Sequence, residues 1–205
     1  LGYTIDDLVE NTSFEEVLYL LHRGQLPNHA ELEELTSTLR TNRNLPQGII
    51  DFLKASPKDA GPMDVIRTGV SMLGLYDQRG EHQNRKLNEE RALAIVAKIP
   101  LIVAGFHRFR QGLEMIEPRD DLNEAAHFLY LINGEVPSDD AAKTLDVAYI
   151  LHADHGMNAS TFSSRVTIAT LSDIYSSITS AIGTLKGPLH GGANEEVMHM
   201  MNKIK

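Results

Sequence analysis

The sequence contains no cysteine, which excludes disulfide bonds and thiolate metal sites and agrees with a reducing compartment. No stretch approaches the roughly 18 consecutive apolar residues of a transmembrane helix, so no segment is expected to span a membrane. A basic surplus is also absent, because 28 acidic and 19 basic side chains give a formal net charge of −9. Nucleic acid is therefore not an expected partner, since phosphate binding needs clustered Lys and Arg. No signal or transit peptide is visible.

The alternation of apolar and polar residues that marks half-buried strands is missing too, and the chain instead predicts helices joined by short turns. Capping boxes at residues 13–16 and 28–31 predict two helix starts, and Gly24 is a natural left-handed stop. With 205 residues, 42% of them hydrophobic, the chain can bury a sizeable core. The expected fold class is all-α.

Further elements follow from proline, glycine and apolar spacing. Pro46 and Pro62 each open a predicted helix, and a polar, exposed loop is expected over 76–87. A long helix is predicted from Asn88 towards Met115, and a further helix stops at Asn133-Gly134, with the next one opening near Ser138. Apolar residues that recur every four positions predict a helix from Phe162 to Ile182. Histidines outside the two segments described next, His127 among them, are expected at the surface or in a core with satisfied hydrogen bonds.

Two short segments carry candidate chemistry, and the first is Gly187-Pro188-Leu189-His190-Gly191-Gly192-Ala193-Asn194. It places a histidine between backbone-bending residues at the start of an expected helix. Unpaired N–H groups and the positive end of the helix dipole disfavour an imidazolium there, so His190 can stay neutral and donate a hydrogen bond. Such a donor can polarise a carbonyl and stabilise an enolate. Alternatively, the glycines and the proline only punctuate a connection between helices, and the histidine is incidental.

The second segment is His152-Ala153-Asp154-His155-Gly156-Met157-Asn158-Ala159-Ser160-Thr161, which gathers two imidazoles, a carboxylate, an amide and hydroxyls around one glycine. The two histidines could share a helical face with the aspartate, but a zinc site needs further ligands, and no spacing in the sequence supplies them. We therefore expect no metal site. Ser160 lacks the Gly-x-Ser-x-Gly elbow of hydrolases, which argues against a nucleophilic serine.

Together the two segments resemble the citrate synthase family, whose H-x-D-H-x-x-N-x-S and G-P-L-H-G-x-A-N blocks follow each other at about this separation. The resemblance extends upstream and covers essentially the whole chain, through Gly2-Tyr3-Thr4-Ile5-Asp6-Asp7-Leu8, Ser13-Phe14-Glu15-Glu16-Val17, Gly24-Gln25-Leu26-Pro27 and Pro62-Met63-Asp64-Val65-Ile66-Arg67-Thr68. One position departs from the family pattern. Gly61 stands where many members have histidine, so no role is carried over to it.

The resemblance implies an acyltransferase that adds the methyl carbon of acetyl-CoA to the ketone of oxaloacetate and hydrolyses the thioester to citrate and CoA, the first step of the tricarboxylic acid cycle. His190 would be the catalytic residue, a neutral donor to the thioester oxygen, and His155 would bind oxaloacetate. Asn158 and Ser160 would orient the imidazole, and His152 would have a structural or a peripheral role. Acetyl-CoA is implied as a cosubstrate, with no permanently bound cofactor.

The resemblance also implies a multi-helix large domain over residues 1–190 and the start of a smaller, mobile helical domain at 191–205. The family's opening segment, its later G-x-G-H block, its catalytic aspartate and several substrate-binding arginines have no counterpart in these 205 residues. The chain is therefore expected to be part of a longer enzyme and to be inactive alone. Two alternatives remain open: a 2-methylcitrate synthase that uses propionyl-CoA, and a non-catalytic helical assembly protein of the same fold.

The resemblance to citrate synthases, which form dimers, also implies a homodimer. Its subunit contacts would come from the helices at 46–56, 62–75, 138–151 and 160–180. Packing within one core would explain the same apolar faces. The form of the motifs is more similar to the bacterial and archaeal branch of the family than to the mitochondrial one, so a cytoplasmic location is expected.

Overall fold

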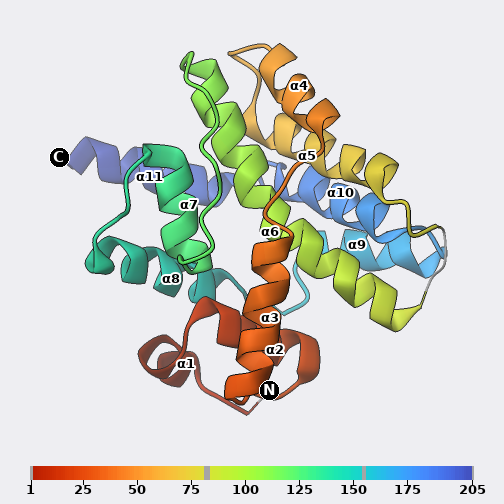
Figure 1. Ribbon diagram of the computed structural model, residues 1–205, viewed down its shortest axis with the longest axis vertical. Helices are drawn as coiled ribbons and strands as arrows, with labels where there is room; N and C mark the ends of the chain where they lie inside the picture. Colours follow the sequence, from red (N-terminus) through yellow and green to blue (C-terminus); the bar gives the residue numbers. More distant parts are fainter. Residues whose placement is uncertain (1, 81–83, 154–155, 205) are drawn as a thin grey trace.

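The computed structural model describes residues 2–80, 84–153 and 156–204, except the side chains of 193–195, and these residues form eleven α-helices and one 3₁₀ turn with no β-strand (Figure 1). The elements are α1 (Ile5–Asn11), α2 (Phe14–Arg23), α3 (His29–Thr41), α4 (Gln47–Ala55), α5 (Pro62–Leu73), the turn η1 (Gly74–Tyr76), α6 (Arg85–Arg110), α7 (Glu124–Asn133), α8 (Asp139–Ala153), α9 (Ala159–Ala169), α10 (Ile174–Leu185) and α11 (Gly192–Ile204). The predicted all-α fold class is confirmed.

Local polar contacts begin and end several helices where the sequence predicts. Both expected capping boxes, 13–16 and 28–31, are formed at the starts of α2 and α3, so that each satisfies two backbone N–H groups that have no partner inside the helix. The helices α2 and α7 end at Gly24 and Gly134, whose φ angles of 82° and 87° lie in the left-handed region. These predictions are confirmed. They are possible from the sequence because each depends on residues only a few positions apart.

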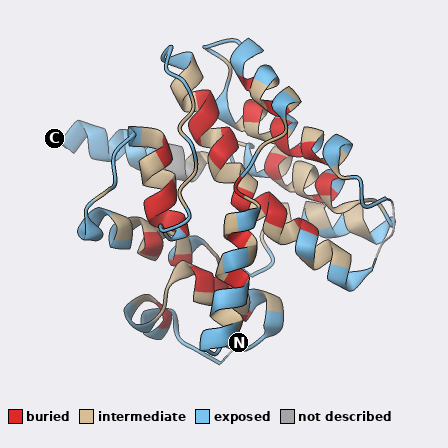
Figure 2. Ribbon diagram, in the orientation of Figure 1, coloured by how far each residue is buried: buried red, intermediate tan, exposed pale blue. Residues whose placement is uncertain are grey.

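The helix α6 runs through the middle of the molecule and packs against α3, α4, α5, α7 and α10 (Figure 1). Buried residues follow it along much of its length (Figure 2), and Leu101 and Ile102 are completely buried. It begins and ends earlier than predicted. Asn84 caps its first turn, and Gly112, with a φ of 79°, lies in the turn that follows its end.

By length and composition alone, α6 is apolar enough to cross a membrane, although the sequence has no long uninterrupted apolar run. Its position in the fold gives the physical reason for its composition. Of its most apolar window, 44% is buried inside the protein, where it contacts five other helices. It also carries Arg91, which is buried and pairs with Asp77 at 2.6 Å. A core helix in contact with neighbours on several sides is apolar over most of its surface.

The segment from Phe162 to Ile182, expected to form one helix, belongs to two helices. The first, α9, ends at Ala169, and Leu171 adopts a φ of 65° in the turn. The second, α10, begins after Asp173, whose side chain accepts a hydrogen bond from the Ser176 N–H at 2.9 Å. The four-residue spacing continues through the turn, so periodicity does not reveal the break. The two helices pack together as an antiparallel hairpin.

The polar stretch 76–87 is mostly exposed in its described residues, as predicted, but Asp77 is an exception. Its side chain is only 6% exposed and accepts hydrogen bonds from Arg79, Arg91 and Tyr175. Burial by itself would raise the pKa of Asp77, but these hydrogen bonds outweigh it and hold that pKa well below its ordinary value. Asp77 therefore links the end of the η1 turn to α6 and α10 instead of facing solvent.

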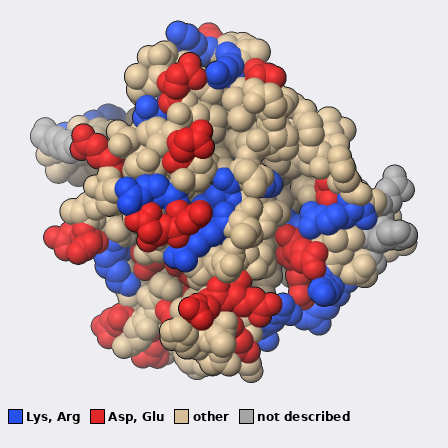
Figure 3. Space-filling view, viewed as in Figure 1, with Lys and Arg blue, Asp and Glu red and all other residues tan. Residues whose placement is uncertain are grey.

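Acidic and basic side chains are mixed on the face shown in Figure 3, where Lys and Arg lie beside Asp and Glu rather than in one continuous basic surface. Exposed ion pairs also occur, such as Lys54–Glu114 at 3.1 Å. Surface pairs of this kind are screened by salt and stabilise a fold only weakly.

A different ion pair is buried at the first turn of α7. Arg43, between α3 and α4, contacts Glu124 through Nη2 at 2.7 Å, and both side chains are at most 3% exposed. The carboxylate of Glu15 accepts a hydrogen bond from the Glu124 backbone N–H at 2.8 Å. Burial raises the pKa of the Glu15 carboxyl, and the nearby charges of Glu124 and Asp146 raise it further. The fold therefore holds several ionisable groups in its interior.

His127 lies one turn along α7 from this ion pair. It is completely buried, and neither ring nitrogen forms a hydrogen bond with any residue that the structure describes. The expectation of a surface position or a core with satisfied hydrogen bonds is therefore wrong for this histidine. Burial, and secondarily the charge of Arg43, lowers the pKa of the imidazole to about 4.

We expect His127 to make stability depend on pH. The unfolded histidine takes up a proton near its ordinary pKa of 6.5, whereas the folded one stays neutral down to about pH 4. The unfolded state therefore binds more protons between these values, and the free energy of unfolding falls as the pH is lowered from 6.5 towards 4. The measurement is urea unfolding of the native protein and of His127→Leu between pH 7.5 and 4.5. The free energy of unfolding of the native protein, relative to that of His127→Leu, should fall by about 2–3 kcal/mol over this range. A difference that stays constant with pH would contradict a histidine that is buried and neutral.

Candidate functional site

His190 lies in the turn between α10 and α11, two residues before α11 begins, which agrees with the predicted position near a helix start. The turn is held by backbone hydrogen bonds. The Gly187 N–H donates to the Thr184 carbonyl at 3.1 Å, the His190 N–H donates to the Gly187 carbonyl at 2.9 Å, and the Gly191 N–H donates to the Leu185 carbonyl at 2.9 Å. The backbone around His190 is therefore a folded unit attached to the last turn of α10.

Gly191 is required by this turn itself. A β-carbon at this position would collide with the Leu185 carbonyl oxygen, which accepts the hydrogen bond from the Gly191 N–H. Glycine permits close approach of another group to the backbone because it has no side chain. At Gly191, the approach that the structure shows is to the protein's own backbone.

The imidazole of His190 reaches across to the first turn of α9, where its Nε2 lies 3.0 Å from Ser160 Oγ. Ser160 Oγ lies 2.9 Å from Asn158 Oδ1, and the same amide oxygen accepts the Thr161 N–H at 2.8 Å as the N-cap of α9. The structure therefore brings together three of the predicted site residues, His190, Ser160 and Asn158. They form a chain of hydrogen bonds that starts at a helix cap.

The Ser160 hydroxyl has one proton and two neighbours that can accept it. When the hydroxyl donates to Asn158, Ser160 Oγ accepts a hydrogen bond from Nε2–H of His190, and Nδ1 is left as an acceptor. When the hydroxyl instead donates to Nε2, the neutral ring carries its proton on Nδ1, which becomes a donor. A rotation of one hydroxyl thus decides whether His190 offers a donor or an acceptor to a bound molecule.

The other predicted imidazoles are placed differently. His152 lies in the last turn of α8, and its Nδ1 is 2.7 Å from the Ala148 carbonyl oxygen, so this nitrogen donates to the histidine's own helix. Asp154 and His155 lie outside the described residues, and the role of His155 stays a prediction. Within the described part of the chain, no group of three or more His, Cys, Asp or Glu side chains is arranged to hold a metal ion.

Hydroxyl groups that the sequence analysis does not single out join α9 to α10. Thr184 Oγ1 lies 2.8 Å from Ser163 Oγ, which donates to the Ser160 carbonyl oxygen at 3.0 Å. A second pair, Ser164 and Ser177, joins the same helices at 2.8 Å further from the turn that follows α10. The available signal was the clustering of Ser and Thr at spacings of three, four and seven on both helices, which indicates a polar contact between them.

A family model described as "Citrate synthase, C-terminal domain" matches residues 1–205. Relatives include citrate synthase 2 of Bacillus subtilis, which is 53% identical over 100% of this chain and 55% of its own length. The citrate synthase of Haloferax volcanii is 48% identical over 99% of this chain and 55% of its length, and a 2-methylcitrate synthase of Shewanella oneidensis is 44% identical over 100% and 54%. The chain thus spans about half the length of the curated relatives it matches.

Solved structures are similar over the same extent. The citrate synthase of Pyrobaculum aerophilum has a TM-score of 0.88 at 39% identity and covers 99% of this chain and 53% of its own. The citrate synthase of Thermoplasma acidophilum, a ternary complex with carboxymethyl coenzyme A and oxaloacetate, has a TM-score of 0.92 at 27% identity and covers 100% of this chain and 54% of its own. Because the family model spans every residue and the similarity extends to both sequence and fold, this chain belongs to the citrate synthase family.

Proposed function

We propose that the protein containing this chain is a citrate synthase, an acyltransferase that condenses acetyl-CoA with oxaloacetate and hydrolyses the resulting thioester to citrate and CoA. The observation that carries the proposal is the contact of His190 Nε2 with Ser160 Oγ at 3.0 Å, in a chain of hydrogen bonds that ends at Asn158. The 53% identity to citrate synthase 2 of Bacillus subtilis supports the same reaction.

In the proposed reaction, His190 stabilises the enol or enolate formed from the thioester. Removing a proton from the methyl carbon places negative charge on the thioester oxygen, and a fixed hydrogen-bond donor at that oxygen lowers the barrier. With the Ser160 hydroxyl turned towards Nε2, the neutral imidazole presents Nδ1–H as this donor. Asn158 is the N-cap of α9 and accepts the Thr161 N–H, and so holds the first helical turn that carries Ser160. Ser160 and Asn158 are thus positioning residues in this proposal, and His190 is the catalytic residue.

The remaining parts of the proposal concern substrates. His155 is proposed to bind oxaloacetate, as the resemblance implies, and His152 is proposed to support the end of α8 through its bond to the Ala148 carbonyl. Acetyl-CoA is a cosubstrate, and no permanently bound cofactor is proposed. A 2-methylcitrate synthase that uses propionyl-CoA is the second candidate, which the 44% identity to the Shewanella oneidensis enzyme favours.

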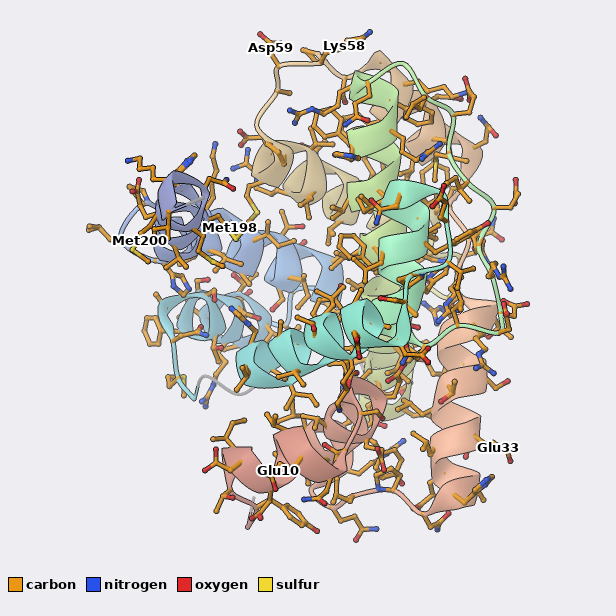
Figure 4. All side chains as sticks on the ribbon, turned by 90° about the vertical axis from the view of Figure 1, so that its left-hand side faces the viewer. Glu10, Glu33, Lys58, Asp59, Met198 and Met200 are labelled. Carbon is orange, nitrogen blue, oxygen red and sulfur yellow. The ribbon has the colours of Figure 1, made fainter. Side chains whose placement is uncertain are left out.

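We place the domain boundary near residue 190, so that α11 begins a second domain. The packing of α11 supports this, because its apolar side chains Val197, Met198, Met200, Met201 and Ile204 are all exposed. Figure 4 shows Met198 and Met200 on this helix at the side of the molecule. A helix with an exposed apolar face usually packs against a further element.

A homodimer is proposed as the assembly, and the exposed apolar face of α9 supports it. Phe162 and Val166 on this face are 62% and 53% exposed. The apolar face of α4, also expected at a subunit contact, packs within the chain, since Ile49 and Leu53 are buried in its own core. A cytoplasmic location is proposed on the resemblance to the bacterial and archaeal branch alone.

The test is release of free thiol from acetyl-CoA and from propionyl-CoA by the full natural polypeptide that contains these residues, with and without oxaloacetate. A citrate synthase releases thiol faster from acetyl-CoA and only when oxaloacetate is present, whereas a 2-methylcitrate synthase prefers propionyl-CoA. Release that does not depend on oxaloacetate would point to a thioester hydrolase. No release from either thioester would contradict both enzymes and leave the helical assembly protein.

A further inference from the structure

The contact between Ser160 and His190 closes a ring of interactions that runs through α9 and α10. On α9, Ser163 lies one turn after Ser160 and donates to its carbonyl oxygen at 3.0 Å. Across the helix pair, Thr184 Oγ1 lies 2.8 Å from Ser163 Oγ. The carbonyl of Thr184 accepts the Gly187 N–H, which begins the turn that carries His190. Both partners of the Ser160–His190 hydrogen bond are thus attached to the same contact between the helices.

This ring fixes a distance that the proposed reaction needs. Hydrogen bonds weaken quickly beyond about 3.2 Å, and catalytic groups act well only when they are held within about 0.5 Å of the productive geometry. The last turn of α10 sets the position of the His190 backbone, and the first turn of α9 sets the position of Ser160. A small displacement of one helix end along the other would therefore separate the imidazole from the hydroxyl that orients it.

We propose that Ser163 and Thr184 are positioning residues for His190, and that their hydroxyl contact holds the end of α10 against α9 so that the imidazole meets Ser160. The inference rests on the proposed function, in which His190 acts on the thioester. Neither hydroxyl touches the reacting groups in this proposal. Thr184 Oγ1 also lies 3.0 Å from the Ser180 carbonyl oxygen, a contact within α10. Its contact with Ser163 is the one that joins α10 to α9.

The chain offers a matched control for this device. Ser164 and Ser177 join the same two helices through the same kind of contact, at 2.8 Å, but Ser177 lies about two turns of α10 before Thr184. Thr184→Val removes one hydrogen bond between α9 and α10, whereas Ser177→Ala removes two contacts, because Ser177 Oγ also donates to the Ser164 carbonyl oxygen at 2.8 Å. Only loss of the Ser163–Thr184 contact releases the helix end that leads directly into the His190 turn.

The experiment compares Thr184→Val, Thr184→Ser and Ser177→Ala in the full natural polypeptide. Valine keeps the shape of threonine without the hydroxyl, so kcat should fall about tenfold while the KM for oxaloacetate changes less than about twofold. Serine restores the hydroxyl and should return kcat to within about twofold of the native value. Ser177→Ala should leave kcat within about twofold. Urea unfolding of each variant measures the loss of stability, which should be at least as large for Ser177→Ala as for Thr184→Val because more contacts between the helices are removed.

A second measurement separates this inference from the proposed function. The ¹⁵N resonances of the His190 imidazole, assigned by comparison with His190→Ala, report the hydrogen bond at Nε2 without any need for activity. They should shift in Thr184→Val and stay unchanged in Ser177→Ala. Unchanged resonances in Thr184→Val, or equal effects of Thr184→Val and Ser177→Ala on kcat, would overturn the inference. A protein with shifted resonances and no synthase activity would refute the proposed function and leave the positioning of His190 by Thr184 supported.

Discussion

Replacing His190 by alanine is expected to lower kcat of the full natural polypeptide by about 10²- to 10³-fold, the range typical for loss of one donor to a developing oxyanion. The physical reason is the position of the imidazole, which Ser160 holds at 3.0 Å while the other ring nitrogen is available to a thioester oxygen. A donor that acts mainly in the transition state lowers kcat and kcat/KM together. The KM for oxaloacetate should therefore change much less than kcat. Initial rates over a matrix of both substrate concentrations measure the two effects separately.

His152→Ala is the matched control, since it removes an imidazole that belongs to the same motif block as Ser160. Nδ1 of this histidine donates to the Ala148 carbonyl of its own helix. We expect its loss to change kcat by less than about threefold, within the range of a modest structural contribution. His190→Gln, which keeps an N–H donor, should retain more activity than His190→Ala. Equal losses for His152→Ala and His190→Ala, or an effect of His190→Ala on KM alone, would contradict the assigned role.

The parts of the fold that the sequence predicts depend on short-range interactions. The capping boxes at 13–16 and 28–31 join residues three apart, and Gly24 ends a helix because of its own backbone freedom. The break between α9 and α10 escapes prediction because Leu171, with a φ of 65°, interrupts the helix without interrupting the apolar spacing. A left-handed leucine has no local signal, since the residue type disfavours that conformation.

The candidate site shows the same division. The resemblance places His190 and Ser160 in one site, but their contact joins residues 30 positions apart and depends on how α9 and α10 pack. Thr184 and Ser163 are 21 positions apart, and neither belongs to a motif. Their contact follows from the register of two helices against each other, which periodicity on one helix does not determine.

The buried ion pair of Arg43 is the least predictable feature of the interior, because its partner is 81 positions away. Arg43 lies in the short connection between the end of α3 and Pro46, the N-cap of α4. An arginine in such a connection is usually exposed. In the structure its guanidinium contacts Glu124 and the backbone carbonyl oxygens of Arg119 and Leu122. It thereby ties α3 to the irregular segment 111–123 that leads into α7.

Arg43→Met is expected to lower the free energy of unfolding by about 3–5 kcal/mol, the usual effect of removing one partner of a buried ion pair. Glu124 would be left charged and almost completely buried, and two backbone carbonyl oxygens would lose their donor. Arg43→Lys should recover only part of the loss, because one ammonium group does not reproduce the planar fork of contacts. Lys54→Met, which breaks the exposed pair with Glu114, is the control and should cost less than about 1 kcal/mol. Urea unfolding at pH 7 measures all three variants.

The double variant Arg43→Met/Glu124→Leu separates the two tasks of Arg43. Replacing both partners of a buried ion pair by apolar residues is often nearly neutral, so the double variant should recover the part of the loss that comes from an unpaired Glu124. It does not restore donors to the carbonyl oxygens of Arg119 and Leu122, and a residual loss of about 1–3 kcal/mol should remain. Faster proteolysis within 111–123 in both variants would show that the remaining loss of stability lies in the segment that Arg43 anchors. If Arg43→Met cost no more than Lys54→Met, the buried pair would contribute nothing beyond a surface pair, and the anchoring role would be refuted.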